Sequence, residues 1–192
     1  MNADNSISSP RSSSYIALFA ALLAVFGMIP KIDLPFGVPI TLQTLGVMLG
    51  GCLLGPRRAF FTLLLFLLAV ALGLPLLSGG RGGIGVFLAP SSGFLIGFLF
   101  GAPVTGLLMR RFHRGAGAGL FVAAFLSSLI GGVLVIYLFG IVGLALLAHM
   151  TFTQAGIAVL AFIPGDLIKC VVCALLVQNV MRAMPAWRLD RD

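Results

Sequence analysis

Long apolar runs alternate with short polar segments along nearly the whole chain. A helix that crosses a bilayer of roughly 30 Å needs about 20 residues. Most runs reach or approach that length, and the short second run spans only with help from flanking residues or a thinner local bilayer. The pattern therefore predicts an all-α integral membrane protein, a bundle of six transmembrane helices. The six runs are 15–29, 41–54, 59–77, 92–109, 116–139 and 155–181.

Two stretches near the C-terminal end depart from this simple pattern. Residues 140–149 form a further apolar piece that is too short to span, and we interpret it as a re-entrant or interfacial helix leading into the sixth span. Pro164 and Gly165 lie inside the sixth run, where they favour a kink or a broken turn. Such a break frees backbone polar groups, which must then face a cavity rather than lipid.

Charged residues are sparse, and their placement predicts the topology. Only 9% of the residues are charged, against about a quarter in a soluble domain. With the N-terminus inside, nine basic residues fall on inner segments and two, Lys31 and Arg81, on outer loops. This asymmetry follows the positive-inside rule and predicts a multi-pass protein of the cell (inner) membrane with both termini cytoplasmic. The inner basic residues are Arg11, Arg57, Arg58, Arg110, Arg111, Arg114, Arg182, Arg188 and Arg191.

The net charge of +7 does not indicate a nucleic-acid-binding protein. The basic residues stand singly or in short clusters between apolar runs, not on one continuous basic segment. In a bilayer, their sign favours contact with the anionic lipids of the inner leaflet. We therefore expect the lipid bilayer, and not nucleic acid, as the partner of these charges.

The tails and loops complete the predicted organisation. Residues 1–14 are rich in Ser and Asn, carry no clear signal-peptide cleavage site, and are predicted to form a disordered cytoplasmic tail. Residues 15–182 form one membrane domain, and 183–192 form a short cytoplasmic tail. The outer loops 30–40 and 78–91 are long and rich in Gly and Pro, so we predict that they cap a ligand site.

Asp166 and Lys169 are the first candidates for a ligand site because both charges lie within the sixth run. Three residues apart on a helix, they share a face. A charge at membrane depth costs at least roughly 2.5–3.5 kcal/mol, so it normally faces a partner or a cavity. One alternative is a mutual pair that only locks helix packing. The break expected at Pro164 favours the functional interpretation.

Arg81 lies among glycines in the segment SGGRGGIG. The planar guanidinium suits a carboxylate, and the backbone N–H groups of nearby glycines can approach a ligand closely. A solvated loop charge or a lipid headgroup contact is an equal alternative for Arg81. The segment also fits G-x-G-x-x-G, but that motif requires a strand before it and a helix after it, and here the flanks are membrane helices. The candidate glycines are Gly79, Gly80, Gly82 and Gly83.

Two uncharged polar residues are further candidates. Gln43 opens the second run at its outer end and could supply an amide to a pocket, although Thr41 and Thr44 beside it also suit a helix cap. Tyr137 lies near the outer end of the fifth run, where an aromatic belt is the ordinary explanation.

Reactive chemistry is not indicated. Cys170 and Cys173 have C-x-x-C spacing, but they lie in an apolar helical run with no second pair, so we interpret them as packing residues and predict no metal. Ser127, Ser128 and His149 could suggest an intramembrane protease, but no nucleophile motif surrounds the serines. We predict no catalytic residue and no enzyme activity.

Small residues recur at helical spacing in the first run, as Ala17/Ala21 and Ala20/Ala24. Small side chains four residues apart let membrane helices approach closely. The pattern fits either packing inside the bundle or docking of another membrane protein.

Three segments together resemble the BioY family, the biotin-specific substrate-capture components of energy-coupling factor transporters. The resemblance covers about residues 15–181. It implies a six-helix membrane protein that binds biotin from outside with high affinity. It also implies a transmembrane coupling protein and two ATPase subunits as partners, with the alanine pattern resembling the family's docking face. The three segments are VPITLQTLGVMLGGCLLGPRRA, LPLLSGGRGGIGVFLAPSSGFLIGF and FIPGDLIKCVVCALL.

The chemistry of biotin fits the candidate residues. The ureido N–H groups suit Asp166, an acceptor when ionised, and the ureido carbonyl suits Lys169 or Gln43. The carboxylate suits Arg81 and the glycine N–H groups, and Tyr137 could contact the rings. We expect biotin as the transported substrate and no cofactor. The alternatives are a self-contained secondary carrier or channel for another small anionic solute, and an intramembrane enzyme.

Overall fold

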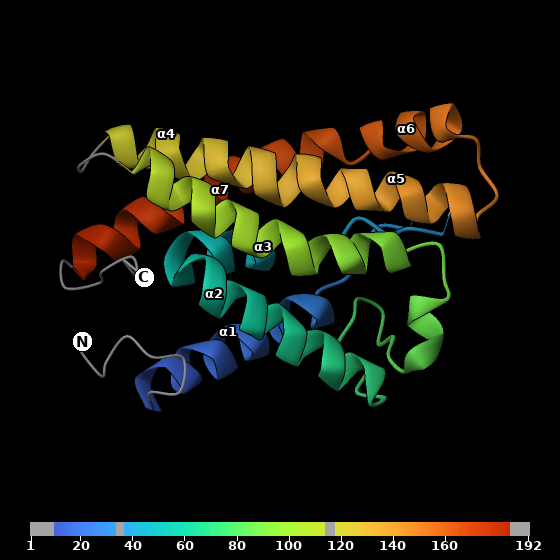
Figure 1. Cartoon of the computed structure of the whole chain (residues 1–192), viewed down its shortest axis with the longest axis horizontal. Helices are drawn as coiled ribbons and strands as arrows, with labels where there is room; N and C mark the ends of the chain where they lie inside the picture. Colours follow the sequence, from blue (N-terminus) through green and yellow to red (C-terminus); the bar gives the residue numbers. More distant parts are fainter. Residues whose placement is uncertain (1–9, 34–36, 114–117, 185–192) are drawn as a thin grey trace.

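Helices account for most of the residues described by the computed structural model, which are 10–33, 37–113 and 118–184. Figure 1 shows α3 lying alongside a long rod built from α4, η3 and α5, with α2 and α1 on the other side of α3. The elements are α1 (Pro10–Met28), α2 (Gln43–Ala71), the 3₁₀ helix η2 (Ile84–Phe87), α3 (Ser92–Phe112), α4 (Ala118–Ser127), the π-helix η3 (Ser128–Val135), α5 (Ile136–Leu147), α6 (Phe152–Leu160) and α7 (Ile163–Ala183).

Within the described residues, five helical stretches are long and apolar enough to cross a membrane. The all-α membrane class is therefore confirmed. The number of spans depends on whether α2, which contains most of the second and third predicted runs, counts as one span or two. Gly55 interrupts α2 with φ +77° and ψ 174°, a conformation that favours glycine. Gln43 at its start contacts Leu76 and Ser78 just beyond its end, so the two arms of α2 run back alongside each other.

The prediction of a separate short helix over 140–149 is wrong. α4, η3 and α5 form one continuous apolar stretch, Gly119–Leu147, and the helix ends only before His149, whose φ is +53°. Two glycines within 140–149 do not break the helix, because each packs against α3. Gly140 lies against the ring of Phe94, and Gly143 lies against the backbone of Gly93.

The sixth predicted run is two helices rather than one. α6 begins with a capping box, in which the Thr151 side chain accepts from the Gln154 backbone and the Gln154 side chain accepts from the Thr151 backbone. The helix is interrupted at Ala161 and Phe162, and α7 starts with Pro164 in its first turn. The expected break before Asp166 is therefore present, two to three residues ahead of Pro164.

Glycines bring η3 and α3 into close contact. A Cβ on Gly131 of η3 would lie 2.2 Å from the Thr105 hydroxyl and 2.8 Å from the Gly101 carbonyl. Such contact leaves no room for a side chain at Gly131. The π-helix thus lies directly against α3, and Tyr137 follows it in α5.

α1 begins and α7 ends at the same end of the bundle (Figure 1). α1 starts at Pro10, so residues 10–14 belong to this helix and not to the predicted tail, while residues 1–9 and 185–192 lie outside the described residues. At this end Arg58 Nε donates to Ser12 Oγ at 2.8 Å. A Cβ on Gly55 would lie 2.8 Å from the Arg110 guanidinium. Basic residues from α2 and α3 therefore gather at this end of the bundle.

Candidate functional site

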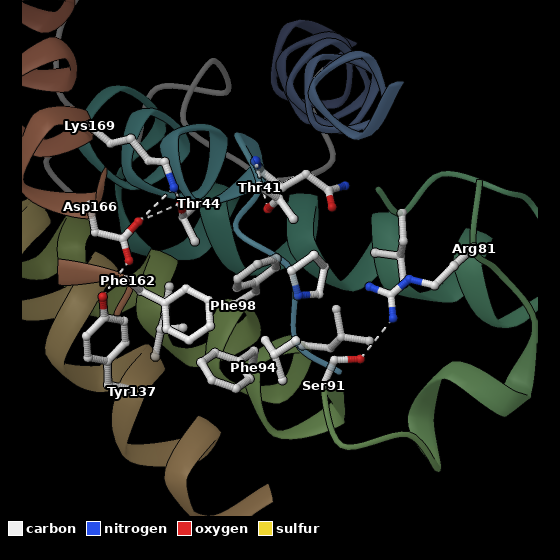
Figure 2. Close-up of a pocket in the computed structure, with 16 residues that line it drawn as sticks. Thr41, Thr44, Arg81, Ser91, Phe94, Phe98, Tyr137, Phe162, Asp166 and Lys169 are labelled. Carbon is white, nitrogen blue, oxygen red and sulfur yellow. Dashed lines mark hydrogen bonds and ion pairs between the residues drawn. The ribbon is translucent and has the colours of Figure 1, made fainter. Parts of the chain in front are cut away.

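A cavity opens between α2, α3, α5 and α7, near the end of the bundle that carries loops 30–40 and 78–91. Figure 2 shows polar groups at two sides of this cavity, with the rings of Phe94, Phe98 and Phe162 between them. One polar group is centred on Asp166 and the other on Arg81. Apolar walls with a few convergent polar groups are typical of small-molecule sites.

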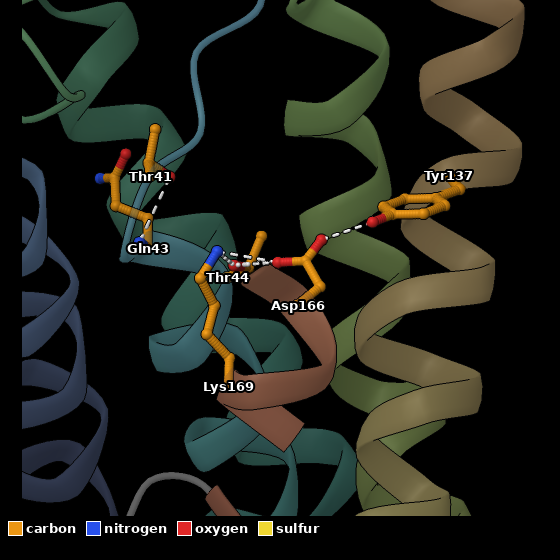
Figure 3. A network of polar contacts seen from close by, with 6 residues as sticks. All are labelled: Thr41, Gln43, Thr44, Tyr137, Asp166 and Lys169. Carbon is orange, nitrogen blue, oxygen red and sulfur yellow. Dashed lines mark hydrogen bonds and ion pairs between the residues drawn. The ribbon is translucent and has the colours of Figure 1, made fainter. Parts of the chain in front are cut away.

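Asp166 is the centre of a four-residue polar cluster (Figure 3). Lys169 Nζ donates to Asp166 Oδ1 at 2.8 Å and to Thr44 Oγ1 at 2.9 Å. Thr44 Oγ1 donates to Asp166 Oδ1 at 3.2 Å, and Tyr137 Oη donates to Asp166 Oδ2 at 2.7 Å. Side chains from α2, α5 and α7 therefore meet at one carboxylate.

The break before α7 explains where Asp166 lies. Its backbone N–H donates to Phe162 O at 2.9 Å, which places the carboxylate in the first turn of α7. The positive end of a helix dipole favours a carboxylate at this position. Lys169 follows one turn later on the same face and pairs with it.

The Asp166–Lys169 pair is buried, with 3% of Asp166 and 8% of Lys169 exposed. A buried pair is tolerated only when further hydrogen bonds satisfy it, and Thr44 and Tyr137 supply these bonds. The cluster is therefore complete without a ligand. A ligand that binds to it must offer donors and acceptors that can replace or extend these contacts.

Arg81 lies on the opposite side of the cavity lining (Figure 2). Its Nε donates to Ser78 O at 3.2 Å, and its Nη1 donates to the Ser91 hydroxyl at 3.2 Å. A guanidinium has five N–H donors, and the described residues accept two of them. A carboxylate in the cavity could receive the others.

The predicted glycines do not line the cavity. Gly79, Gly80 and Gly83 have φ of +80°, +69° and +82°, so they shape the turns of the loop. The N–H of Gly83 is donated to Val70 O at 2.7 Å, and a Cβ on Gly82 would lie 2.2 Å from Leu74 O. In the described structure these four glycines form the loop that carries Arg81, and their assignment as ligand donors remains a prediction.

Gln43 is buried, and its amide is engaged by the protein itself. Its Nε2 donates to Leu23 O at 3.2 Å and to Leu76 O at 3.1 Å, and its Oε1 accepts from the N–H and hydroxyl of Ser78, both at 3.4 Å. Figure 3 shows the Gln43 amide pointing away from the Asp166 cluster. Gln43 lines part of the cavity, but its amide hydrogen-bonds to α1, to Leu76 beyond α2 and to Ser78 of loop 78–91.

Sequence reasoning missed Thr44 and Ser91 as members of the site. Thr44 was noted only as a flanking capping residue, yet its hydroxyl bonds both Asp166 and Lys169. Ser91 immediately precedes α3 and accepts from Arg81. Both residues lie at helix starts, next to the loops that were expected to cap a ligand site, and that shared position is the one sequence signal that could have indicated them.

The four alanines of α1 lie along one stripe of the helix, at i, i+3, i+4 and i+7 spacing, but they differ in exposure. Ala17 and Ala21 are exposed, next to exposed Leu18. Ala20 and Ala24 are half-buried and pack against the core. Ala17 and Ala21 are therefore the more accessible two of the four alanines.

The three cysteines are buried inside the bundle. Ser128 Oγ donates to Cys173 Sγ at 3.4 Å and lies 3.7 Å from Cys52 Sγ. Cys170 is also fully buried. These positions agree with the interpretation of the cysteines as packing residues.

Comparison with known proteins gives a consistent result. The model of the BioY family matches residues 1–186. The chain is 50% identical over 180 residues to the biotin transporter BioY of Rhizobium etli, covering 92% of this chain and 96% of that protein. It is 44% identical over 190 residues to the biotin transporter BioY of Rhodobacter capsulatus, covering 94% and 98%. The crystal structure of the S-component for biotin from an ECF-type ABC transporter superposes with a TM-score of 0.83, at 28% identity and 95% coverage of both chains.

Proposed function

The chain belongs to the BioY family, and on that premise we propose that it captures biotin for uptake as the substrate-specific membrane component of an energy-coupling factor transporter. The observation that carries this proposal is the match along the whole chain to biotin transporters and to a biotin S-component. The family is one of transporters, so the chain is a multi-pass membrane transport protein and not an enzyme.

Several finer features belong to the same proposal. The protein resides in the cell (inner) membrane with both termini in the cytoplasm, and biotin is its substrate rather than a resident cofactor. A transmembrane coupling protein and two ATPase subunits supply the energy for uptake. The chain itself captures biotin with high affinity from the outer side. The gathering of Arg58 and Arg110 at the end where α1 begins and α7 ends supports this orientation.

We assign the two polar groups of the cavity to the two ends of biotin. The ureido N–H groups donate to Asp166, and the ureido carbonyl accepts from Lys169. Tyr137 orients the Asp166 carboxylate through its 2.7 Å hydrogen bond. The carboxylate of biotin lies at Arg81, and the rings and alkyl chain lie against the phenylalanines between them. One acid and two bases give the site a charge of +1, which suits a monoanion.

Mass spectrometry of the purified protein for co-purified biotin tests the function directly. We expect biotin to be released on denaturation at close to one molecule per chain. Isothermal calorimetry on ligand-free protein provides the second measurement. Protein that carries no biotin and gives no heat with added biotin would refute the proposal. Transport in vesicles without any ATPase would favour the alternative, a self-contained carrier for small anions.

The role of Arg81 can be tested with biotin methyl ester, which lacks the anionic tail. Arg81→Ala should weaken binding of biotin by about 1.5–3 kcal/mol, the usual contribution of a hydrogen bond to a charged group, and should change binding of the ester far less. Calorimetry with both ligands measures the difference. Equal losses for the two ligands would indicate a structural role for Arg81 in loop 78–91.

Docking of the coupling protein at the exposed alanines of α1 can be tested by introducing a bulky side chain there. Ala21→Trp should prevent co-purification of the coupling protein while leaving biotin binding unchanged, because Ala21 is exposed and the residues that line the cavity come from other elements than α1. Leu138→Trp is the matched control, since Leu138 of α5 is 64% exposed on another helix. Co-purification that survives Ala21→Trp, or that is lost equally in both variants, would refute docking at this face.

A further inference from the structure

The backbone of Arg81 is fixed by the loop that carries it. The N–H of Arg81 donates to Leu77 O at 3.2 Å, and the N–H of Leu77 donates to Arg81 O at 3.0 Å. Gly79 and Gly80, both with positive φ, close the turn between these two residues. The Cα of Arg81 therefore has one position, and only the long side chain retains freedom.

Two contacts remove most of that freedom. Arg81 Nε donates to Ser78 O, a contact made within the same loop. Ser78 is itself held by Gln43, whose Oε1 accepts from both its N–H and its hydroxyl. The other contact, from Nη1 to the Ser91 hydroxyl, reaches the far end of the loop, at the residue that precedes α3. The guanidinium is thus held at its inner nitrogen by Ser78 and at one outer nitrogen by Ser91, at the two ends of loop 78–91.

Ser91 is suited to this task by its own position. It is 4% exposed, it lines the cavity, and its carbonyl accepts from the N–H groups of Phe94 and Leu95. Ser91 is therefore anchored to the first turn of α3. If its hydroxyl were absent, the Nε contact to Ser78 would remain, but the outer nitrogens of Arg81 would turn freely about that contact.

We propose that Ser91 is a positioning residue that sets the selectivity of the site for a carboxylate, by holding the Arg81 guanidinium toward the cavity before the ligand arrives. This inference rests on the proposed function, in which Arg81 receives the tail of biotin. A guanidinium that is already ordered loses less conformational entropy when an anion binds, and this saving appears as affinity for the anion alone.

The test compares Ser91→Thr with Ser91→Val. The threonine and valine side chains have nearly the same shape, but only threonine carries a hydroxyl. Calorimetry gives the affinities of the purified wild type and both variants for biotin and for biotin methyl ester. Ser91→Val should reduce the preference for the acid over the ester about three- to tenfold, by lowering affinity for biotin while affinity for the ester stays the same. Ser91→Thr should retain the wild-type preference. Binding of the ester shows in each variant that the site is folded.

The outcomes separate this inference from the proposal on which it rests. If the wild type prefers the acid and Ser91→Val keeps that preference, the inference is wrong and the role of Arg81 stands. If both variants lose the preference equally, the side-chain shape and not the hydroxyl is responsible, and the inference is also wrong. A wild type that binds acid and ester equally would overturn both. Ser91→Ala, with the same expected loss as Ser91→Val, serves if the branched side chain prevents folding.

Discussion

Asp166→Ala is expected to abolish biotin binding and to destabilise the protein by about 3–5 kcal/mol, the usual cost of leaving one member of a buried ion pair alone. The variant leaves the ammonium of Lys169, which is 8% exposed, with the Thr44 hydroxyl as its one remaining partner among the described residues. It also leaves the buried hydroxyl of Tyr137 without its acceptor. Unfolding of the purified protein, followed with and without biotin, measures both effects.

A second variant separates structure from ligand binding at this site. Asp166→Ala/Lys169→Met removes both charges, so most of the lost stability should return, because replacing a whole buried pair by apolar groups is often close to neutral. Binding should remain lost, since the partners assigned to the ureido group are gone. A double variant that is as unstable as the single one would contradict the pairing argument. Biotin binding that persists in either variant would remove Asp166 from the ligand site.

Gly131→Ala is expected to destabilise the bundle by about 1–3 kcal/mol or more, which is typical of overpacking in a tight interface. The added Cβ would lie 2.2 Å from the Thr105 hydroxyl, 2.4 Å from its backbone nitrogen and 2.8 Å from the Gly101 carbonyl. The two backbone atoms of α3 cannot move aside as the end of a flexible side chain could. The shift of η3 should also displace Tyr137 from Asp166 and weaken biotin binding.

Gly156→Ala is the control for this experiment. Gly156 lies in α6, and a Cβ there meets no heavy atom within 4 Å. Because alanine has the better helix propensity, the control should be neutral or stabilise by up to about 1 kcal/mol. Thermal unfolding in detergent compares the two variants with the wild type. Equal unfolding temperatures for Gly131→Ala and Gly156→Ala would show that the contact between η3 and α3 relaxes without cost.

Much of the architecture follows from the sequence because the bilayer imposes strong rules. Apolar runs must be helical to satisfy their backbone, so the membrane helices were predictable. The ends of the helices were less so. Gly140 and Gly143 could mark a break or a close contact, and only the positions of Phe94 and Gly93 on α3 decide between the two. The reversal between the second and third predicted runs likewise depends on one residue, Gly55, which interrupts α2.

The candidate site was partly predictable for the same energetic reason. A charge costs free energy inside a membrane, so Asp166 and Lys169 could be selected without a structure. Uncharged polar residues carry no such signal. The direction of the Gln43 amide and the contact of Thr44 with Asp166 depend on how α2 is rotated against its neighbours. Sequence reasoning therefore found the charged centre of the cluster but not the residues that orient it.

The π-helix before Tyr137 has a consequence for comparing this chain with its relatives. A wide turn accommodates one more residue than an α-helix does over the same length, and each helical residue advances the azimuth by about 100°. The direction of the Tyr137 ring toward Asp166 therefore depends on the residue count of η3 as well as on the hydrogen bond between the two side chains. In a relative with a single deletion in this segment, the aligned tyrosine would be turned by about 100° away from the carboxylate.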